Sequence, residues 1–138
     1  MKKYSFQLYS ARNFSSLADL LKTIASMGYE QVEGFSDLYN DLEKLTNALE
    51  LSGLQMTSGH FGIDELENDI EGCMAVIRAT NMKAIFCPYL SPEERPLTAV
   101  KWSEFGTRLQ KGFCRKDFRF LLIFSSEPIN MLKNKQHI

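Results

Sequence analysis

LQMTSGHFGID (residues 54–64) is the stretch of the sequence that decides the fold. Its first part, LQMTS (54–58), alternates apolar and polar residues, which is typical of a half-buried strand. Apolar residues recur at helical spacing before it, and Gly53 stands where that helix should end. Asp64 begins another run of helical spacing. The stretch is therefore predicted to be a strand between two helices, with a glycine-rich bend around His60.

The same pattern of strand and helix recurs on both sides of this stretch. Predicted strands cover residues 4–10, 30–35, 54–58 and 83–90. Predicted helices begin at Ser15 or Ser16, at Ser36 or Asp37 (continuing to Leu49), at Asp64 (continuing to Ile77), and near Pro96 or Thr98. Strand starts are about 24 to 29 residues apart, which accommodates one strand, one crossover helix and two short loops. Strict alternation predicts an α/β fold with about four parallel βα repeats, either an open sheet or half of an eight-stranded barrel.

Composition restricts the class of protein. With 138 residues, of which 44% are hydrophobic, the chain can bury the core of one domain. No apolar run approaches the roughly 20 residues that span a bilayer, and MKKYSFQLYSAR (1–12) lacks the apolar stretch of a secretory signal, so we expect a cytoplasmic protein. A net charge of -1 gives no reason to expect nucleic acid or a membrane surface as partner. The odd set of Cys73, Cys87 and Cys114 has no CxxC spacing, which favours reduced thiols over disulfides or a zinc site.

Charge divides the chain into two segments. Residues 1–110 contain 10 Lys and Arg against 15 Asp and Glu, whereas residues 111–138 contain 6 against 2. Such a change indicates an interaction tail or a sequence of different origin. We therefore expect a half barrel over 1–110 and a divergent, basic and aromatic tail over 111–138, with FRFLLIF (118–124) as a candidate fifth strand.

Polar side chains follow every predicted strand. No GxGxxG or GxxxxGK[ST] motif follows any of them, which excludes the usual phosphate-binding loops of nucleotide-binding sheets. The polar or reactive residues at these ends are Ser10, Arg12, Asn13, Glu33, Asp37, Ser58, His60, Tyr89 and Glu93. Barrel enzymes build their active sites at the carboxyl ends of successive strands, so this distribution favours the half barrel.

Four separated blocks carry a resemblance to a known family. SFQLYSARNF, MGYEQVEGF, SGLQMTSGHFGID and PYLSPEERPLTAVKWSEFGTRL resemble, in this order, the amino-terminal half of the xylose isomerase-like TIM barrel family of sugar phosphate isomerases and epimerases. The resemblance covers about residues 4–110. It implies a full barrel of roughly 250 residues, and metal-dependent aldose-ketose isomerisation or epimerisation of a small sugar or sugar phosphate. The metal, Mn or Mg, is implied to bind mainly residues of strands five to eight.

The segment 111–138 departs from this family pattern. The His-Asn-His type motif and the acidic metal ligand that the resemblance implies after strand five do not follow FRFLLIF. We therefore assign this chain no catalytic residue, no metal ligand and no cofactor, and expect it to be inactive alone. The alternative is a non-catalytic binding or assembly module derived from the fold.

A reading-frame change or truncation of the gene is our hypothesis for the origin of the segment 111–138. A half barrel leaves strand edges open, so we expect a homo-oligomer that closes the ring.

His60 is the sharpest candidate for the ancestral substrate pocket. A neutral imidazole offers one hydrogen-bond donor and one acceptor, which suits a sugar hydroxyl. Gly59 and Gly62 are expected to allow a tight turn and the close approach of a ligand. The structural alternative is that His60 only hydrogen-bonds a neighbouring loop.

Glu33 and Tyr89 complete the predicted substrate-binding set. Glu33 ends a strand, where a charged group needs a partner or a polar function. It is expected either to bind a substrate hydroxyl or to form an ion pair with Arg12 or another loop cation. Tyr89 follows the fourth strand and either stacks on a sugar face or caps the core, the second alternative being slightly favoured.

Overall fold

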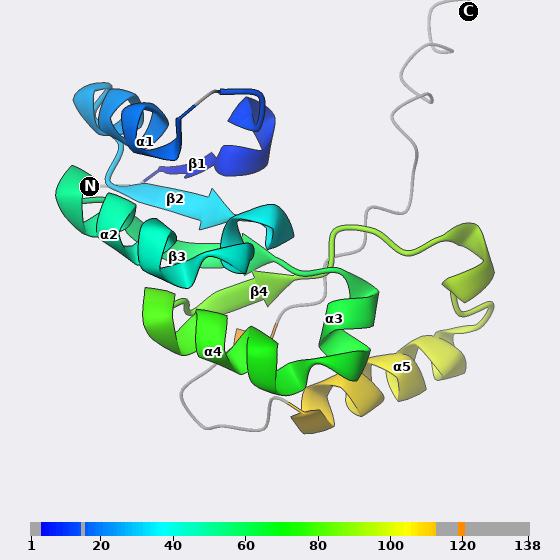
Figure 1. Ribbon diagram of the computed structural model, residues 1–138. Coiled ribbons are helices and arrows are strands. Elements are labelled where there is room, and N and C mark those ends of the chain that lie inside the picture. The colour runs from blue at the N-terminus through cyan, green and yellow to red at the C-terminus, as the bar shows by residue number, and fades with distance from the viewer. Residues whose placement is uncertain (1–3, 15, 113–118, 121–138) are drawn as a thin grey trace, which may run out of the picture.

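The computed structural model describes residues 4–14, 16–112 and 119–120, and Figure 1 shows their arrangement. The strands are β1 (Ser5–Gln7), β2 (Gln31–Gly34), β3 (Gln55–His60), β4 (Ala84–Phe86) and β5 (Arg119–Phe120). The α-helices are α1 (Leu17–Ser26), α2 (Leu42–Ser52), α3 (Ile63–Asn68), α4 (Ile70–Thr80) and α5 (Ala99–Gly112). Short 3-10 helices are η1 (Leu8–Ala11), η2 (Ser36–Asn40) and η3 (Pro92–Glu94).

The described strands form one parallel sheet in chain order, β1-β2-β3-β4-β5. This confirms the predicted α/β fold of parallel βα repeats. The helices α1, α2 and α4 lie on the same face of the sheet (Figure 1). The opposite face is not covered by these three helices, and it carries the polar side chains at the strand ends.

The core lies between the sheet and these helices. Strand side chains that point toward the helices are almost fully buried, as for Val32, Met56 and Ile85, which are at most 1% exposed. The helices contribute apolar residues at helical spacing, namely Leu20, Leu21, Ile24, Leu45, Ala48, Leu49, Cys73, Met74, Val76 and Ile77. Each large apolar side chain buried in this way contributes roughly 1.5–3 kcal/mol of transfer free energy.

Two helices begin later than the sequence pattern predicts, because aspartates cap them. Ser16 caps α1 as expected, its Oγ accepting a hydrogen bond from the Asp19 N–H. The predicted helix from Ser36 or Asp37 was wrong in its start, because that segment is the 3-10 helix η2. Asp41 caps α2. The predicted helix from Asp64 to Ile77 is two helices, α3 and α4, because Asp69 ends the first and caps the second.

The carboxyl-terminal tail lies largely outside the described residues. Within the predicted strand 118–124, Arg119–Phe120 forms β5 and pairs with β4, while 118 and 121–124 lie outside the described part. Cys73 and Cys87 are buried free thiols, as expected, and Cys114 is among the residues not described. None of the helices in the described part of the chain combines the length and apolar character that a membrane crossing requires.

Candidate functional site

The sheet face opposite the helices brings polar residues of three adjacent strands together. Gln7 of β1 is in register with Glu33 of β2, and Glu33 is in register with Ser58 of β3. An irregularity in the β2–β3 pairing lies between Val32 and Glu33, opposite Met56 and Ser58, so that β3 contributes one extra residue there. This shift points Ser58 to the open face, although Met56, two residues earlier, is buried against the helices.

Glu33 is the centre of this cluster. Its Oε1 lies 3.0 Å from His60 Nε2 and accepts a hydrogen bond of 3.3 Å from Gln7 Nε2. Its Oε2 accepts a hydrogen bond of 2.9 Å from Ser58 Oγ. The hydrogen bond with His60 is the largest influence that lowers the pKa of Glu33 below its ordinary value; burial opposes it, and Ser58 and Gln7 reinforce it. Glu33 is therefore a carboxylate at neutral pH, held in one orientation by three partners.

Arg12 is not the partner of Glu33 that one structural alternative predicted. Its Nη1 donates to the Tyr9 backbone oxygen at 3.0 Å, and its guanidinium lies 4.3 Å from the centre of the Tyr9 ring. The segment after β1 forms η1, and Arg12 at its end contacts Tyr9 within this same segment. The partner of Glu33 is instead an imidazole on the neighbouring strand.

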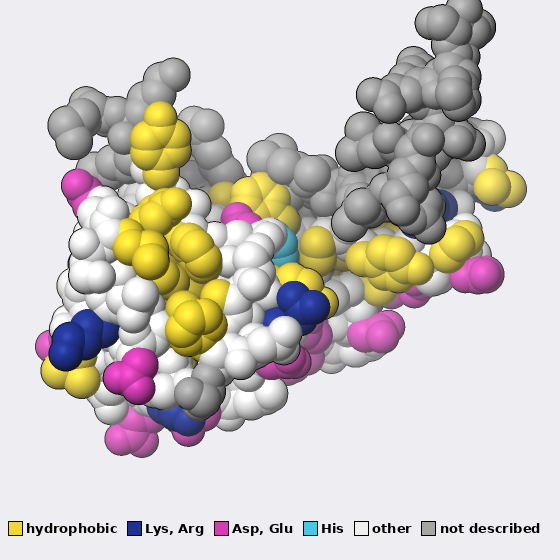
Figure 2. Space-filling view, turned by 90° about the horizontal axis from the view of Figure 1, so that it is seen from above, with side chains coloured by type: hydrophobic (Ala, Val, Ile, Leu, Met, Phe, Trp, Pro, Cys, Tyr) yellow, Lys and Arg dark blue, Asp and Glu magenta, His cyan; other side chains and the backbone are white. Residues whose placement is uncertain are grey.

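His60 is the last residue of β3 and lies within the sheet, whereas the sequence predicted a bend. Its side chain is 17% exposed, and its ring meets that of Phe86 edge to face at 6.0 Å. Figure 2 shows the histidine, in cyan, reaching the surface between groups of apolar side chains. In the neutral imidazole whose Nε2–H donates a hydrogen bond to Glu33, the other ring nitrogen, Nδ1, is a hydrogen-bond acceptor.

The expected role of the two glycines in a tight turn was wrong. Gly59 is a strand residue and Gly62 is the N-cap of α3 with a φ of -68°. Neither has the positive φ found at Gly28 and Gly53. Gly59 is required for a different reason, because a Cβ at this position would collide with the hydroxyl of Tyr39.

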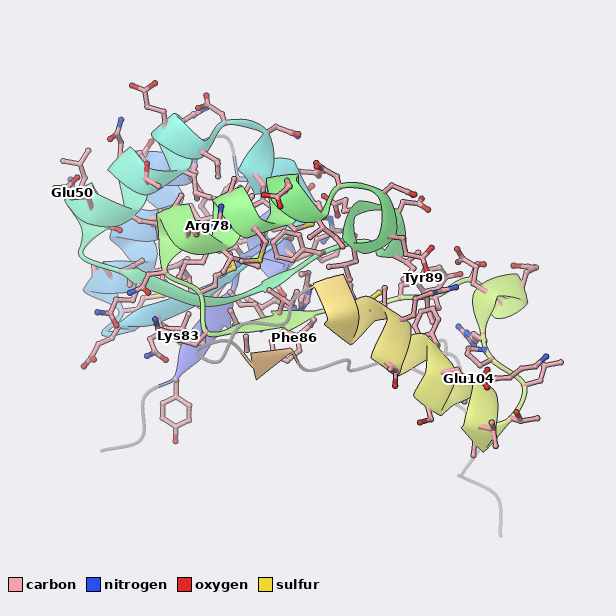
Figure 3. All side chains as sticks on the ribbon, turned by 90° about the horizontal axis from the view of Figure 1, so that it is seen from below. Glu50, Arg78, Lys83, Phe86, Tyr89 and Glu104 are labelled. Atoms are coloured by element: carbon pink, nitrogen blue, oxygen red, sulfur yellow. The ribbon has the colours of Figure 1, made fainter. Side chains whose placement is uncertain are left out.

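Tyr89 does not join the cluster. Its side chain is 60% exposed, so it does not cap the core, which was the favoured alternative. The Arg95 guanidinium lies 6.0 Å from its ring centre. Tyr89 belongs to the segment between β4 and α5, and Figure 3 shows it apart from Phe86 at the end of β4. Stacking on a sugar remains a prediction for this ring.

Gln7 is the member of the cluster that the sequence did not single out. It lies inside the predicted first strand and is the last residue of β1, and glutamine alone is not diagnostic of a site. The only signal was its position: in a parallel sheet a polar residue near the end of one strand lies beside those of the next. Identifying it required the register Gln7–Glu33–Ser58, which the sequence does not specify.

The described residues do not supply a complete metal site. No group of three or more His, Cys, Asp or Glu side chains lies close enough together in the described part of the chain to hold an ion. Glu33 and His60 offer two ligands, whereas catalytic metal sites use three or more protein ligands. The metal implied by the resemblance therefore has no matching ligand set among the described residues.

Two cavities occur away from the cluster. One of about 410 Å³ lies between α3 and α5 and is lined by Glu67, Glu104, Phe105 and Arg108 among others. The other, of about 390 Å³, lies at the start of β3 and β4 beside Glu50 and Lys83. Neither is lined by Gln7, Glu33, Ser58 or His60.

Comparison with known proteins places the fold. No family model and no curated protein matches the sequence, but solved structures match the fold with high probability. An AP endonuclease of family 2 from Brucella melitensis has a TM-score of 0.71 at 12% identity over 88% of this chain and 55% of its own. A sugar phosphate isomerase/epimerase from Parabacteroides distasonis has a TM-score of 0.64 at 14% identity, over 89% and 51%.

A protein from Salmonella typhimurium that contains a xylose isomerase domain has a TM-score of 0.64 at 16% identity, over 88% of this chain and 50% of its own. The chain therefore shares the fold of about half of each of these structures. It spans about half of their length. This confirms the predicted resemblance to xylose isomerase-like and sugar phosphate isomerase/epimerase proteins at the level of the fold.

Proposed function

We propose that this chain binds a small sugar or sugar phosphate at the carboxyl ends of β1, β2 and β3, as a member or fragment of the sugar isomerase and epimerase family. The observation that carries the proposal is the hydrogen-bonded cluster of Gln7, Glu33, Ser58 and His60. It lies at the strand ends where barrel enzymes bind their substrates. Similar folds in a sugar phosphate isomerase/epimerase and in a 3-keto-D-glucoside 4-epimerase from E. coli support this substrate class.

The chemistry of the cluster suits a polyhydroxy ligand. The Glu33 carboxylate accepts hydrogen bonds from hydroxyls, and the second imidazole nitrogen of His60 accepts a further one. The contact with Glu33 orients the His60 ring with Nε2 toward the carboxylate. A hydroxyl that donates to Nδ1 would therefore meet a ring held in position, which reduces the entropy lost on binding.

Binding without catalysis is the expected behaviour of the isolated chain. An isomerase or epimerase moves a proton at a carbon next to a carbonyl, and the developing oxyanion needs a metal or other electrophile. Glu33 and His60, which contact each other, are groups that can accept a proton. Within the described residues, no set of ligands for an ion accompanies them. The alternative function is a non-catalytic binding or assembly module derived from the fold; a chain that serves only in assembly would bind no sugar.

Nucleic acid is the ligand class suggested by the name of the AP endonuclease. The acidic balance of residues 1–110, with 10 basic against 15 acidic side chains, opposes it because affinity for DNA rests largely on contacts between cations and phosphates. We therefore propose a sugar ligand over a nucleic acid. Short duplex DNA serves as the competing ligand in the test.

The test is a titration of labelled chain with aldoses, ketoses and their phosphates, followed by NMR. We expect the His60 signals to shift with at least one sugar, and His60→Ala or Glu33→Gln to weaken its binding roughly tenfold, about 1.4 kcal/mol. Glu50→Gln on α2, which lines the cavity at the start of β3 and β4 and lies apart from Phe86 at the end of β4 in Figure 3, is the matched control and should leave binding unchanged. If only DNA, or no ligand, shifts His60, the proposal fails.

We also propose that a second copy of the chain covers the open sheet face. All neighbouring strands are parallel, so the β1 edge of one copy can pair with the far edge of another. A two-fold axis along the strands would form both such contacts at once. Sedimentation velocity at micromolar concentrations should give a dimer; a monomer over the whole range would contradict this part of the proposal.

A further inference from the structure

The hydroxyl of Tyr39 lies against two glycines, Gly34 and Gly59, on the side of the sheet opposite the cluster. Gly34 and Gly59 are register partners in β2 and β3. A Cβ on Gly34 would lie 2.8 Å from this hydroxyl oxygen, and a Cβ on Gly59 would lie closer still. The hydroxyl therefore occupies space that side chains at both positions would need. Glu33 and His60 are the chain neighbours of these glycines and point to the opposite face.

Tyr39 is held in this position by its surroundings. It belongs to η2, and its ring stacks on that of Phe61 with 4.8 Å between centres and an angle of 26°. Glu65 Oε2 accepts hydrogen bonds of 2.6 Å from Ser36 Oγ and from the Gly62 N–H. This carboxylate thereby joins the segment that follows β2 to the segment that follows β3.

The buried hydroxyl makes no hydrogen bond of normal geometry among the described residues. Burial, followed by the carboxylates of Glu65 and Glu33, raises the pKa of Tyr39 far above its usual range, so the group stays protonated. The backbone N–H of His60 acts on this pKa in the opposite direction. An unpaired buried hydroxyl costs about 1–3 kcal/mol. Its presence here is accounted for by the space that it fills between the strands and η2.

We infer that Tyr39 is a positioning residue, whose hydroxyl on Gly34 and Gly59 sets the β2–β3 spacing that brings Glu33 to His60. The purpose of this arrangement rests on the proposed sugar site, but its geometry does not. The Tyr39 hydroxyl and the methyl group of an alanine at position 59 would occupy the same space beside β3, so either one fills it and both cannot be present together. Exchanging one for the other should therefore preserve the spacing, because volume-conserving changes are tolerated best.

The test compares Gly59→Ala, Tyr39→Phe and the double variant, with the Glu33 pKa followed by ¹³C NMR. Gly59→Ala should raise this pKa toward its ordinary value, because the collision with Tyr39 separates the strands that hold Glu33 and His60. Tyr39→Phe alone should also raise it, by less, because it removes the hydroxyl that sets the spacing and leaves that space empty without a collision. The double variant should recover most of the loss, since the Met82 side chain, whose Cε would lie 2.8 Å from the new Cβ, can move.

Gly106→Ala is the matched control, because a Cβ there meets nothing within 4 Å. Should Gly59→Ala fail to fold, Gly34→Ala replaces it; its Cβ would lie 2.8 Å from the hydroxyl oxygen and 2.7 Å from Met56 Sδ, so Tyr39→Phe should recover only part of its effect. Additive effects in the double variant, or an unchanged Glu33 pKa in the folded single variant, would overturn the inference. No sugar enters this experiment, so its failure is separate from a failure of the proposed function.

Discussion

The two faces of the sheet differ in what holds their side chains. On the helix-covered face, Val32, Met56 and Ile85 are held by non-directional contacts with apolar helix residues. On the open face, Glu33 is held by three directional hydrogen bonds from two neighbouring strands. The first kind of contact provides stability and tolerates variation in shape. The second provides one orientation of a charged group, which is what a binding site needs.

The largest effect should come from the covered face. Ile85→Ala removes a fully buried side chain and should lower the free energy of unfolding by about 2–5 kcal/mol. Gln55→Ala, exposed on the open face of β3, should change it by less than about 0.5 kcal/mol. Urea unfolding followed by circular dichroism measures both variants. Equal losses would mean that the open face carries as much of the stability as the covered face.

An intermediate effect should come from His60. His60→Ala removes a hydrogen bond to a charged group and should cost about 1.5–3 kcal/mol at neutral pH. The pKa of Glu33 is lowered in the folded state, so its contribution to stability is present above the unfolded-state pKa and is lost as pH falls through the folded-state value. The difference between variant and wild type should therefore shrink below about pH 4. Unfolding curves at several pH values test this, and a constant difference would contradict it.

The smallest effects should rank the partners of Glu33. Its pKa should rise most in His60→Ala, less in Ser58→Ala and least in Gln7→Ala, following the order of their hydrogen-bond contributions. Carboxyl ¹³C titration resolves these shifts. Glu94, whose pKa is lowered by Ser91 at the N-cap of η3, is an internal reference that none of the three variants should move. Any other order would require a different geometry for the cluster.

The sequence was informative where local patterns decide the structure. The alternation of strands and helices, and the caps at Ser16, Gly53 and Thr98, follow from residue type and spacing. Glu33, Ser58 and His60 were identified as polar residues at the ends of strands. The starts of α2 and α4 were missed because the capping aspartates, Asp41 and Asp69, lie within continuous apolar spacing.

What the sequence could not provide depends on register and on packing across the sheet. Gln7 becomes part of the cluster only through its alignment with Glu33. Ser58 points to the open face because of the irregularity between β2 and β3. Gly59 appeared to serve a turn, whereas it makes room for Tyr39, a residue 20 positions away. These are tertiary relationships, and no window of neighbouring residues contains them.

The chain order of the strands has a consequence for how the molecule forms. Each strand pairs with the one made just before it, and the contacts of the cluster span only 26 and 25 residues, from Gln7 to Glu33 and from Glu33 to Ser58. The entropic cost of closing a loop grows with its length, so these contacts cost less to close than contacts between distant strands would. A chain leaving the ribosome can therefore add one repeat at a time. By the time β4 emerges, Glu33 and His60 can already be joined.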